Sequence, residues 1–118
     1  MSIQRIEPGP RMSRAVVHGE TVYISGHVSE GATVAEQAER ILARIETTLH
    51  HAGSSKSKLL SAQIWLADIA TFDEMNAVWE AWIAPGEPPA RATVESRLAG
   101  PEYLIEIAAI AARYPLSS

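Results

Sequence analysis

The chain has 118 residues, of which 47% are hydrophobic, and its formal net charge at pH 7 is −4. This length and composition predict a single globular domain spanning residues 1–118, and they exclude an intrinsically disordered chain. The acidic balance and the lack of a Lys/Arg cluster argue against a nucleic-acid partner, which would require a basic face. Cysteine is absent, which excludes disulfides and thiolate metal sites.

Other classes of function find no support in the sequence. No apolar run approaches the roughly 20 residues needed to cross a bilayer, so we expect no membrane partner. The first residues contain no signal-peptide hydrophobic segment, which favours a cytoplasmic location. The four histidines show no metal-ligand spacing, so no metal site is expected. There is also no glycine-rich phosphate-binding loop.

The residue pattern in the first quarter of the chain predicts strands. Residues 3–7 alternate between polar and apolar and predict an edge strand. The β-rich runs 15–18 and 21–25 are separated only by Gly19-Glu20, which is typical of a hairpin. Gly26 follows directly and permits a β-bulge or the close approach of a ligand to the backbone.

Two helices flank a strand in the middle of the chain. The Thr-x-x-Glu pattern at residues 33–36 predicts a capping box, and an amphipathic helix of about 20 residues then runs to a stop at Gly53. Residues 59–66 alternate and predict a strand with one apolar face. A second Thr-x-x-Glu pattern, residues 71–74, predicts the start of another helix, which ends at Pro85-Gly86.

The last two predicted strands, 91–98 and 103–112, are joined by the turn at residues 99–101. The fold class is therefore α/β (α+β), with the order β, β-β, α, β, α, β, β. Two crossovers through helices make three strands parallel, and the short final turn makes the last strand run opposite to them. We expect both helices on one face of the sheet. The other face, where Trp65 could lie, is then uncovered, which suggests self-association.

Arg91 and Glu106 are the leading functional candidates. Arg91 begins a strand, and its rigid guanidinium suits bidentate capture of a carboxylate or phosphate, with Thr93 beside it on the same strand face. Glu106 lies inside a strongly apolar run, where a carboxylate is costly unless it is paired, hydrogen-bonded or in contact with water. The alternatives are an exposed strand-end arginine and a structural ion pair.

The spacing of these two residues poses a geometric problem. If the last two strands formed a plain hairpin around Gly100, Glu106 would lie opposite Glu95. Arg91 would then be roughly 13 Å away along the strand. The two residues can serve one site only if their strands are not neighbours, or if two subunits contribute.

The motifs resemble the signature of the RidA (YjgF-type) reactive-intermediate deaminases over nearly the whole chain. The 15-residue spacing from Arg91 to Glu106 fits this signature, and the order of elements agrees with it. The matching segments are Pro89-Ala90-Arg91-Ala92-Thr93-Val94-Glu95, Leu98, Leu104-Ile105-Glu106-Ile107, Ala109-Ile110-Ala111, Val22-Tyr23-Ile24-Ser25-Gly26-His27, Gln37–Leu49 and Phe72–Trp82.

This resemblance implies a chorismate-mutase-like fold: a mixed sheet whose last strand inserts between earlier ones, two helices on one face, and a homotrimer with clefts at its subunit interfaces. The implied activity is hydrolysis of 2-imino and enamine acids to 2-keto acids and ammonia, without a cofactor. Arg91 would bind the substrate carboxylate, Glu106 would handle the attacking water, and backbone groups of Ser25 and Gly26 would orient the substrate. The other implied substrate-binding positions are Thr93, His27, Met12 and Trp65.

Three positions depart from the family pattern. Thr93 stands where these deaminases often carry Cys, Met12 where they carry Tyr, and His27 where they carry Gln. Two rival hypotheses therefore remain beside the deaminase. One is a non-catalytic trimer that binds small carboxylates, and the other is a related hydrolase with a divergent substrate. A nucleic-acid-directed activity is disfavoured by the net charge of −4.

Overall fold

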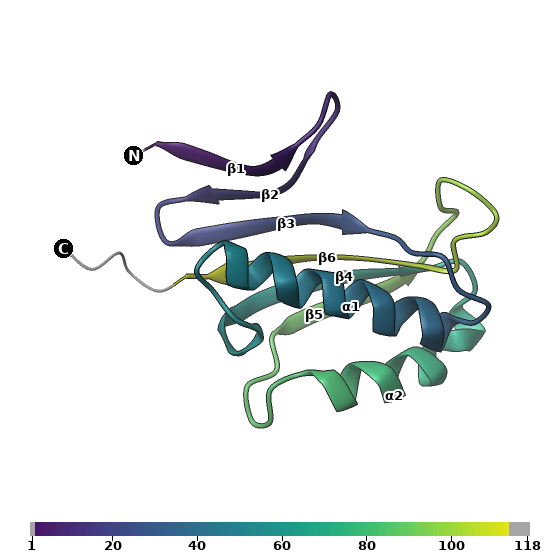
Figure 1. Cartoon of the computed structure of the whole chain (residues 1–118). Coiled ribbons are helices and arrows are strands. Elements are labelled where there is room, and N and C mark those ends of the chain that lie inside the picture. The colour runs from purple at the N-terminus through teal and green to yellow at the C-terminus, as the bar shows by residue number, and fades with distance from the viewer. Residues whose placement is uncertain (1, 114–118) are drawn as a thin grey trace.

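The computed structural model describes residues 2–113, and its elements follow the predicted order (Figure 1). They are β1 (Ile3–Pro8), β2 (Ser13–His18), β3 (Thr21–His27), α1 (Val34–His51), the 3₁₀ turn η1 (Lys56–Lys58), β4 (Leu59–Leu66), the 3₁₀ turn η2 (Ile69–Thr71), α2 (Phe72–Trp82), β5 (Ala90–Glu95) and β6 (Ile105–Ala112).

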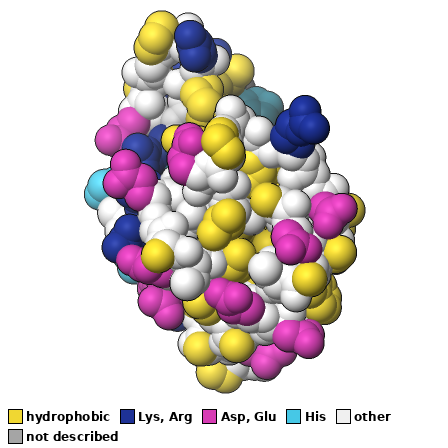
Figure 2. Space-filling model, turned by 90° about the vertical axis from the view of Figure 1, so that its right-hand side faces the viewer, with side chains coloured by type: hydrophobic (Ala, Val, Ile, Leu, Met, Phe, Trp, Pro, Cys, Tyr) yellow, Lys and Arg dark blue, Asp and Glu magenta, His cyan; other side chains and the backbone are white. Residues whose placement is uncertain are grey.

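One face of the molecule is mixed in charge (Figure 2). In the face drawn in Figure 2, Lys and Arg side chains stand singly or in small groups among Asp and Glu side chains and apolar patches. None of the helices within residues 2–113 is long and apolar enough to cross a membrane.

The six strands form one sheet in the order β1-β2-β3-β6-β4-β5 (Figure 1). β6 pairs antiparallel with both β3 and β4, and β4 pairs parallel with β5. The predicted parallel direction of β3, β4 and β5 is confirmed, as is the insertion of the last strand between earlier ones. The plain hairpin of the last two strands is wrong. Both faces of β6 carry mainly apolar side chains, and a central position in the sheet buries more of them than an edge position would.

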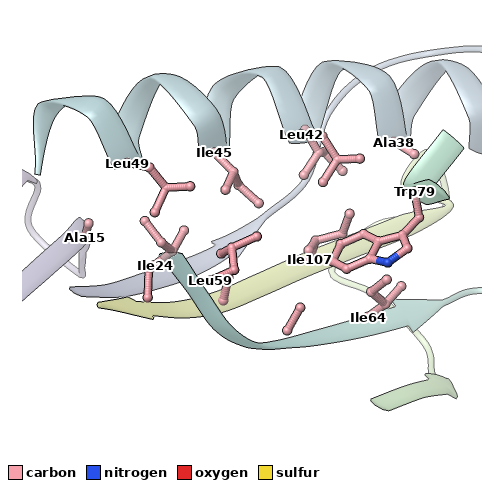
Figure 3. Close-up of a cluster of buried hydrophobic side chains, with 14 of the residues drawn as sticks. Ala15, Ile24, Ala38, Leu42, Ile45, Leu49, Leu59, Ile64, Trp79 and Ile107 are labelled. Atoms are coloured by element: carbon pink, nitrogen blue, oxygen red, sulfur yellow. The ribbon is translucent and has the colours of Figure 1, made fainter. Parts of the chain in front are cut away.

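The hydrophobic core lies between the sheet and the two helices. Figure 3 shows Leu42, Ile45 and Leu49 of α1 directed at the sheet, and Trp79 of α2 directed at Ile64 and its neighbours. Both helices therefore cover one face, as predicted. The opposite face has no covering element within residues 2–113, and apolar side chains on it, Tyr23 and Val94, are 47% and 44% exposed.

The first predicted capping box is confirmed in its Thr33 half, whereas the Glu36 carboxylate accepts from the backbone N–H of Ala32 instead of that of Thr33. The Thr33 side chain accepts a hydrogen bond from the backbone N–H of Glu36 at 3.1 Å, which satisfies one of the free donors in the first turn of α1. α1 ends two residues before Gly53, whose positive φ of 80° is the left-handed conformation that stops a helix.

The second predicted capping box is wrong. Thr71 makes no side-chain cap to α2, because it belongs to η2, where its hydroxyl donates to the Asp68 carbonyl at 2.6 Å. Glu74 instead accepts from the backbone N–H of Ala35 at 3.0 Å. Its carboxylate therefore ties the start of α2 to the start of α1.

The last two strands are shorter than predicted, with β5 ending at Glu95 and β6 beginning at Ile105. β4 ends at Leu66, so residues 97–104 have no neighbouring strand to pair with. Buried Gln37 on α1 holds this segment instead. Its side-chain amide donates to the Glu102 carbonyl and accepts from the Leu104 N–H, both at 2.9 Å.

Candidate functional site

Arg91 lies on the helix-covered side of the sheet. It pairs with Ala62, a buried residue of the core face, so its side chain extends from β5 toward α2. The guanidinium carbon lies 5.4 Å from the centre of the Trp79 ring and 5.8 Å from that of Phe72. Its Nη1 lies 4.0 Å from the sulfur of Met75. The cation thus rests on an apolar, aromatic surface.

The charge of Arg91 has no anionic partner within salt-bridge distance among residues 2–113. Burial lowers the pKa of Arg91 and the negative charge of Glu80 partly offsets this, but an arginine remains protonated under all physiological conditions. Thr93 shares its strand face, and the Thr93 hydroxyl is buried without a hydrogen-bond partner. A partly desolvated cation beside an unsatisfied hydroxyl is suited to binding an anion.

Glu106 lies on the other face of the sheet. It pairs with Trp65 of β4, and both alternate with the core residues of their strands. The Glu106 carboxylate is half-buried and has no hydrogen bond or ion pair with any of residues 2–113, so the structural ion-pair alternative is wrong. It passes directly over Gly26, where a Cβ would lie 3.1 Å from the Glu106 Cδ and overlap Oε2. Glycine is therefore what allows the carboxylate this position.

β3 contains a bulge at Gly26, one of the two roles that the sequence left open for this glycine. Ile24 pairs with Ala109 and His27 with Ile107, so β3 has one more residue than β6 between these pairs. This shift turns His27 to the core side, where it is only 7% exposed. His27 Nδ1 lies 2.6 Å from the Ser25 carbonyl oxygen, and since a carbonyl can only accept, Nδ1 carries the proton.

His27 is neutral at pH 7. Burial lowers the pKa of the ring, and the positive charges of Arg14 and Arg44 lower it further, against the opposing effect of the Ser25 carbonyl. Nε2 is buried and has no partner within residues 2–113. The ring therefore supports the bulge from beneath, through the Ser25 carbonyl.

A pocket of about 290 Å³ opens beside the bulge. It brings together four of the positions singled out in the sequence and adds three charged residues that sequence reasoning missed. The lining includes Met12, Ser25, Gly26 and His27 together with Glu7, Arg14 and Arg44. No local pattern marks Arg14 or Arg44, because β2 and α1 carry them to the pocket from distant parts of the chain.

One chain does not bring Arg91 and Glu106 together. Val94 pairs with Trp65, which pairs with Glu106, so Arg91 lies three residues, about 10 Å, further along the sheet and two strands across. The two side chains also extend from opposite faces. The candidate residues thus form two groups, Arg91 with Thr93 at the helix-covered edge, and Glu106 with the bulge at Gly26, next to a pocket that also reaches Arg44 of α1.

Comparison with known proteins places the chain in a family. The family model described as Endoribonuclease L-PSP matches residues 2–113. The RutC family protein YoaB of Escherichia coli is 42% identical over 114 residues, which span 95% of this chain and 99% of YoaB. This chain belongs to the RutC (YjgF) family.

Solved structures agree with this assignment. A YjgF family member from Neisseria meningitidis is 43% identical, and the match covers 97% of each chain with a TM-score of 0.94. A structure from Salmonella typhimurium, described as a putative translation initiation inhibitor, is 41% identical, covers 94% of this chain and 97% of its own, and has a TM-score of 0.85. The family resemblance of the sequence motifs is therefore confirmed.

Replacing Gly26 with alanine is expected to displace the Glu106 carboxylate without unfolding the chain. The atoms in the way belong to the far end of a flexible side chain, so Glu106 can rotate, and Gly26 does not require a positive φ. A crystal structure of Gly26→Ala measures the displacement. Gly9→Ala is the matched control, because its nearest contact, the Met12 carbonyl oxygen at 3.5 Å, is an ordinary one. An unmoved Glu106 in Gly26→Ala would contradict the packing described.

The low pKa of His27 is expected to make the fold acid-sensitive. As pH falls below the usual histidine pKa of about 6.5, the unfolded chain binds a proton that the folded chain does not, so the free energy of unfolding decreases. Wild type should lose stability relative to His27→Gln by at most about 1.4 kcal/mol per pH unit, while their difference stays constant above about pH 7.5. Urea denaturation between pH 5 and 8 measures this, with His51→Gln, an exposed position, as control. Parallel curves of unfolding free energy against pH for wild type and His27→Gln would exclude His27 as the source of acid sensitivity.

Proposed function

We propose that this protein hydrolyses reactive 2-imino acids, and the enamine acids that tautomerise to them, to 2-keto acids and ammonia. The observation that carries the proposal is the partly buried, unpaired guanidinium of Arg91, which lies near the Trp79 and Phe72 rings on the strand face that it shares with Thr93, whose hydroxyl is unsatisfied. This arrangement is suited to the carboxylate that every 2-imino acid carries.

The aromatic rings lie beneath the guanidinium and use none of its N–H donors. Apart from the Nη1 N–H directed at the Met75 sulfur at 4.0 Å, those donors remain available for a bidentate pair with a carboxylate, and the Thr93 hydroxyl can donate a further hydrogen bond. Fixing the carboxylate in this way would also fix the position of the neighbouring C=N carbon, which is where water must attack.

Glu106 is proposed to handle that water. Its carboxylate would accept a proton as the water oxygen adds to the imine carbon and pass that proton to the nitrogen, which gives a tetrahedral carbinolamine. Glu106 would then take the proton of the carbinolamine hydroxyl and transfer it to the nitrogen as the C–N bond breaks, which releases ammonia and leaves the 2-keto acid. Backbone groups of Ser25 and Gly26, next to Glu106, would orient the substrate. Imine hydrolysis already proceeds in water, so positioning and proton transfer suffice.

The complete site is proposed to form between two copies of the chain, within a homotrimer. Arg91 and Glu106 extend from opposite faces of one sheet, and the face that carries Glu106 and Trp65 has no covering element within residues 2–113. Packing that face against the β5 edge of another copy would cover its exposed apolar residues, including Tyr23 and Val94. It would also bring Glu106 of one copy toward Arg91 of the next.

The rivals are a trimer that binds small carboxylates without turnover and a hydrolase for a different substrate, since Thr93, Met12 and His27 reshape the cleft. The unpartnered Glu106 favours hydrolysis over mere binding, because a site for anions alone gains nothing from a carboxylate. Cleavage of RNA, to which the name of the family model refers, is disfavoured by the net charge of −4 and by the acidic groups spread over the face in Figure 2.

A direct assay tests the proposal. An amino-acid oxidase generates 2-imino acids in the presence of semicarbazide, and semicarbazone formation is followed. The wild-type protein is expected to suppress semicarbazone, and Arg91→Ala is expected to lose at least about tenfold in activity because a charged hydrogen-bond pair is removed. Arg97→Ala, an exposed arginine beyond the end of β5, is the matched control and should behave as wild type. No suppression by wild type for any imino acid would reject the deaminase hypothesis.

Mixed assemblies test the shared cleft. Arg91→Ala and Glu106→Gln are expected to be inactive separately, and active when co-expressed with different affinity tags and purified together. In a random one-to-one mixture about a quarter of the clefts would combine a native Arg91 from one copy with a native Glu106 from another. If both residues act within one chain, the mixture stays as inactive as its components.

A further inference from the structure

The pocket beside Gly26 adjoins the site proposed for the reaction. Gly26 lines this pocket and also lies in contact with the Glu106 carboxylate. A substrate whose imine carbon lies at Glu106, and whose first carboxylate is held by Arg91 of another copy, can direct its remaining substituent into this pocket. The pocket is therefore placed to select the substrate side chain.

The pocket has an excess of positive charge. Arg14 and Arg44 both line it together with His27, and the positive charges of both lower the pKa of that imidazole. His27 is neutral at pH 7 and adds no charge to the lining. The one negatively charged residue in the lining is Glu7. The sum is one net positive charge, in a chain whose net charge is −4.

Both arginines keep N–H donors for a ligand. Arg14 binds Glu7 through Nε at 3.0 Å, and Arg44 donates from Nη1 to the Val28 carbonyl at 3.1 Å. Their other guanidinium N–H groups have no partner among residues 2–113. Met12 adds an apolar wall suited to a short hydrocarbon segment. The pocket thus combines space for methylene groups with free donors for an anion.

We propose that Arg14 and Arg44 bind a second carboxylate at the end of the substrate side chain, so that the preferred substrates are 2-imino dicarboxylic acids such as the imines of aspartate and glutamate. This inference depends on the proposed function, because it takes the positions of the first carboxylate and of the imine carbon from it. One added carboxylate neutralises the excess charge of the pocket. Arg91 anchors the substrate, and Arg14 and Arg44 select it.

The test compares dicarboxylic with neutral imines. D-aspartate oxidase supplies imines from D-aspartate and D-glutamate, and D-amino-acid oxidase supplies the imine of D-leucine; the starting chirality does not matter, because C2 of an imine is planar. Wild type is expected to have a higher kcat/KM for the dicarboxylic imines, and this preference should decrease as salt increases. Arg44→Gln and Arg14→Gln should each lower the ratio of dicarboxylic to neutral kcat/KM by about tenfold.

Two further variants sharpen the comparison. Arg44→Lys, which keeps the charge, should retain part of the preference. Arg40→Gln, which removes an arginine one turn away on α1 that pairs with Glu36 outside the pocket, should leave both activities as in wild type. Equal hydrolysis of neutral and dicarboxylic imines, or a preference that persists in both Arg14→Gln and Arg44→Gln, overturns the inference and leaves the deaminase function intact.

A binding measurement covers the case in which no imine is hydrolysed. Calorimetry with 2-ketoglutarate and 2-ketobutyrate, two stable keto acids, then tests whether the pocket binds a second carboxylate, independently of any hydrolysis. Tighter binding of 2-ketoglutarate that is lost in Arg44→Gln supports the dicarboxylate pocket although the deaminase function has failed. Equal affinities for the two keto acids reject it.

Discussion

The arrangement of the molecule depends on the position of β6 between β3 and β4. β6 pairs antiparallel with both neighbours, and its alternate residues Ile105 and Ile107 are buried beneath the helices. The same pairing carries Glu106 to the bulge of β3, where Gly26 leaves room for its carboxylate. Were β6 the hairpin partner of β5, this apolar strand would lie at an edge, and Glu106 would lie opposite Glu95. Core packing and the placement of a candidate catalytic group thus have one cause.

The environment of Arg91 shows how a fold can hold an unpaired cation ready for a ligand. A carboxylate partner would stabilise the guanidinium but would occupy the N–H donors that an anion needs. The rings of Phe72 and Trp79 attract the charge through their faces and leave those donors free. Partial burial strengthens the attraction for an incoming carboxylate because water screens it less. The side chains of α2 therefore have a double role, in the core and beneath the candidate anion site.

Local patterns predicted the elements, and pairing between distant segments set the limits of that prediction. The hairpin at Gly19, the start of α1 and the bulge at Gly26 follow from backbone preferences of a few neighbouring residues. The insertion of β6 was implied only by family resemblance, because the short turn before it favours a hairpin. Thr71 failed as a helix cap because η2, which the sequence pattern did not reveal, took up its hydroxyl. The side of the sheet to which His27 points could not be predicted from the alternation of the strand, because the extra residue of the bulge reverses that alternation.

The distribution of charge connects the pocket with the proposed cleft between copies. The chain is acidic overall, yet Arg91, Arg14 and Arg44 all retain donors without partners in residues 2–113. If the β5 edge of one copy meets the uncovered face of another, Arg91 of the first would stand near Glu106 of the second, next to the pocket that Arg14 and Arg44 line, and a cleft with low-dielectric walls would concentrate their field on anions. Specificity for a doubly charged acid would then be a property of the assembly rather than of the single chain, because neither half of the cleft carries both carboxylate sites.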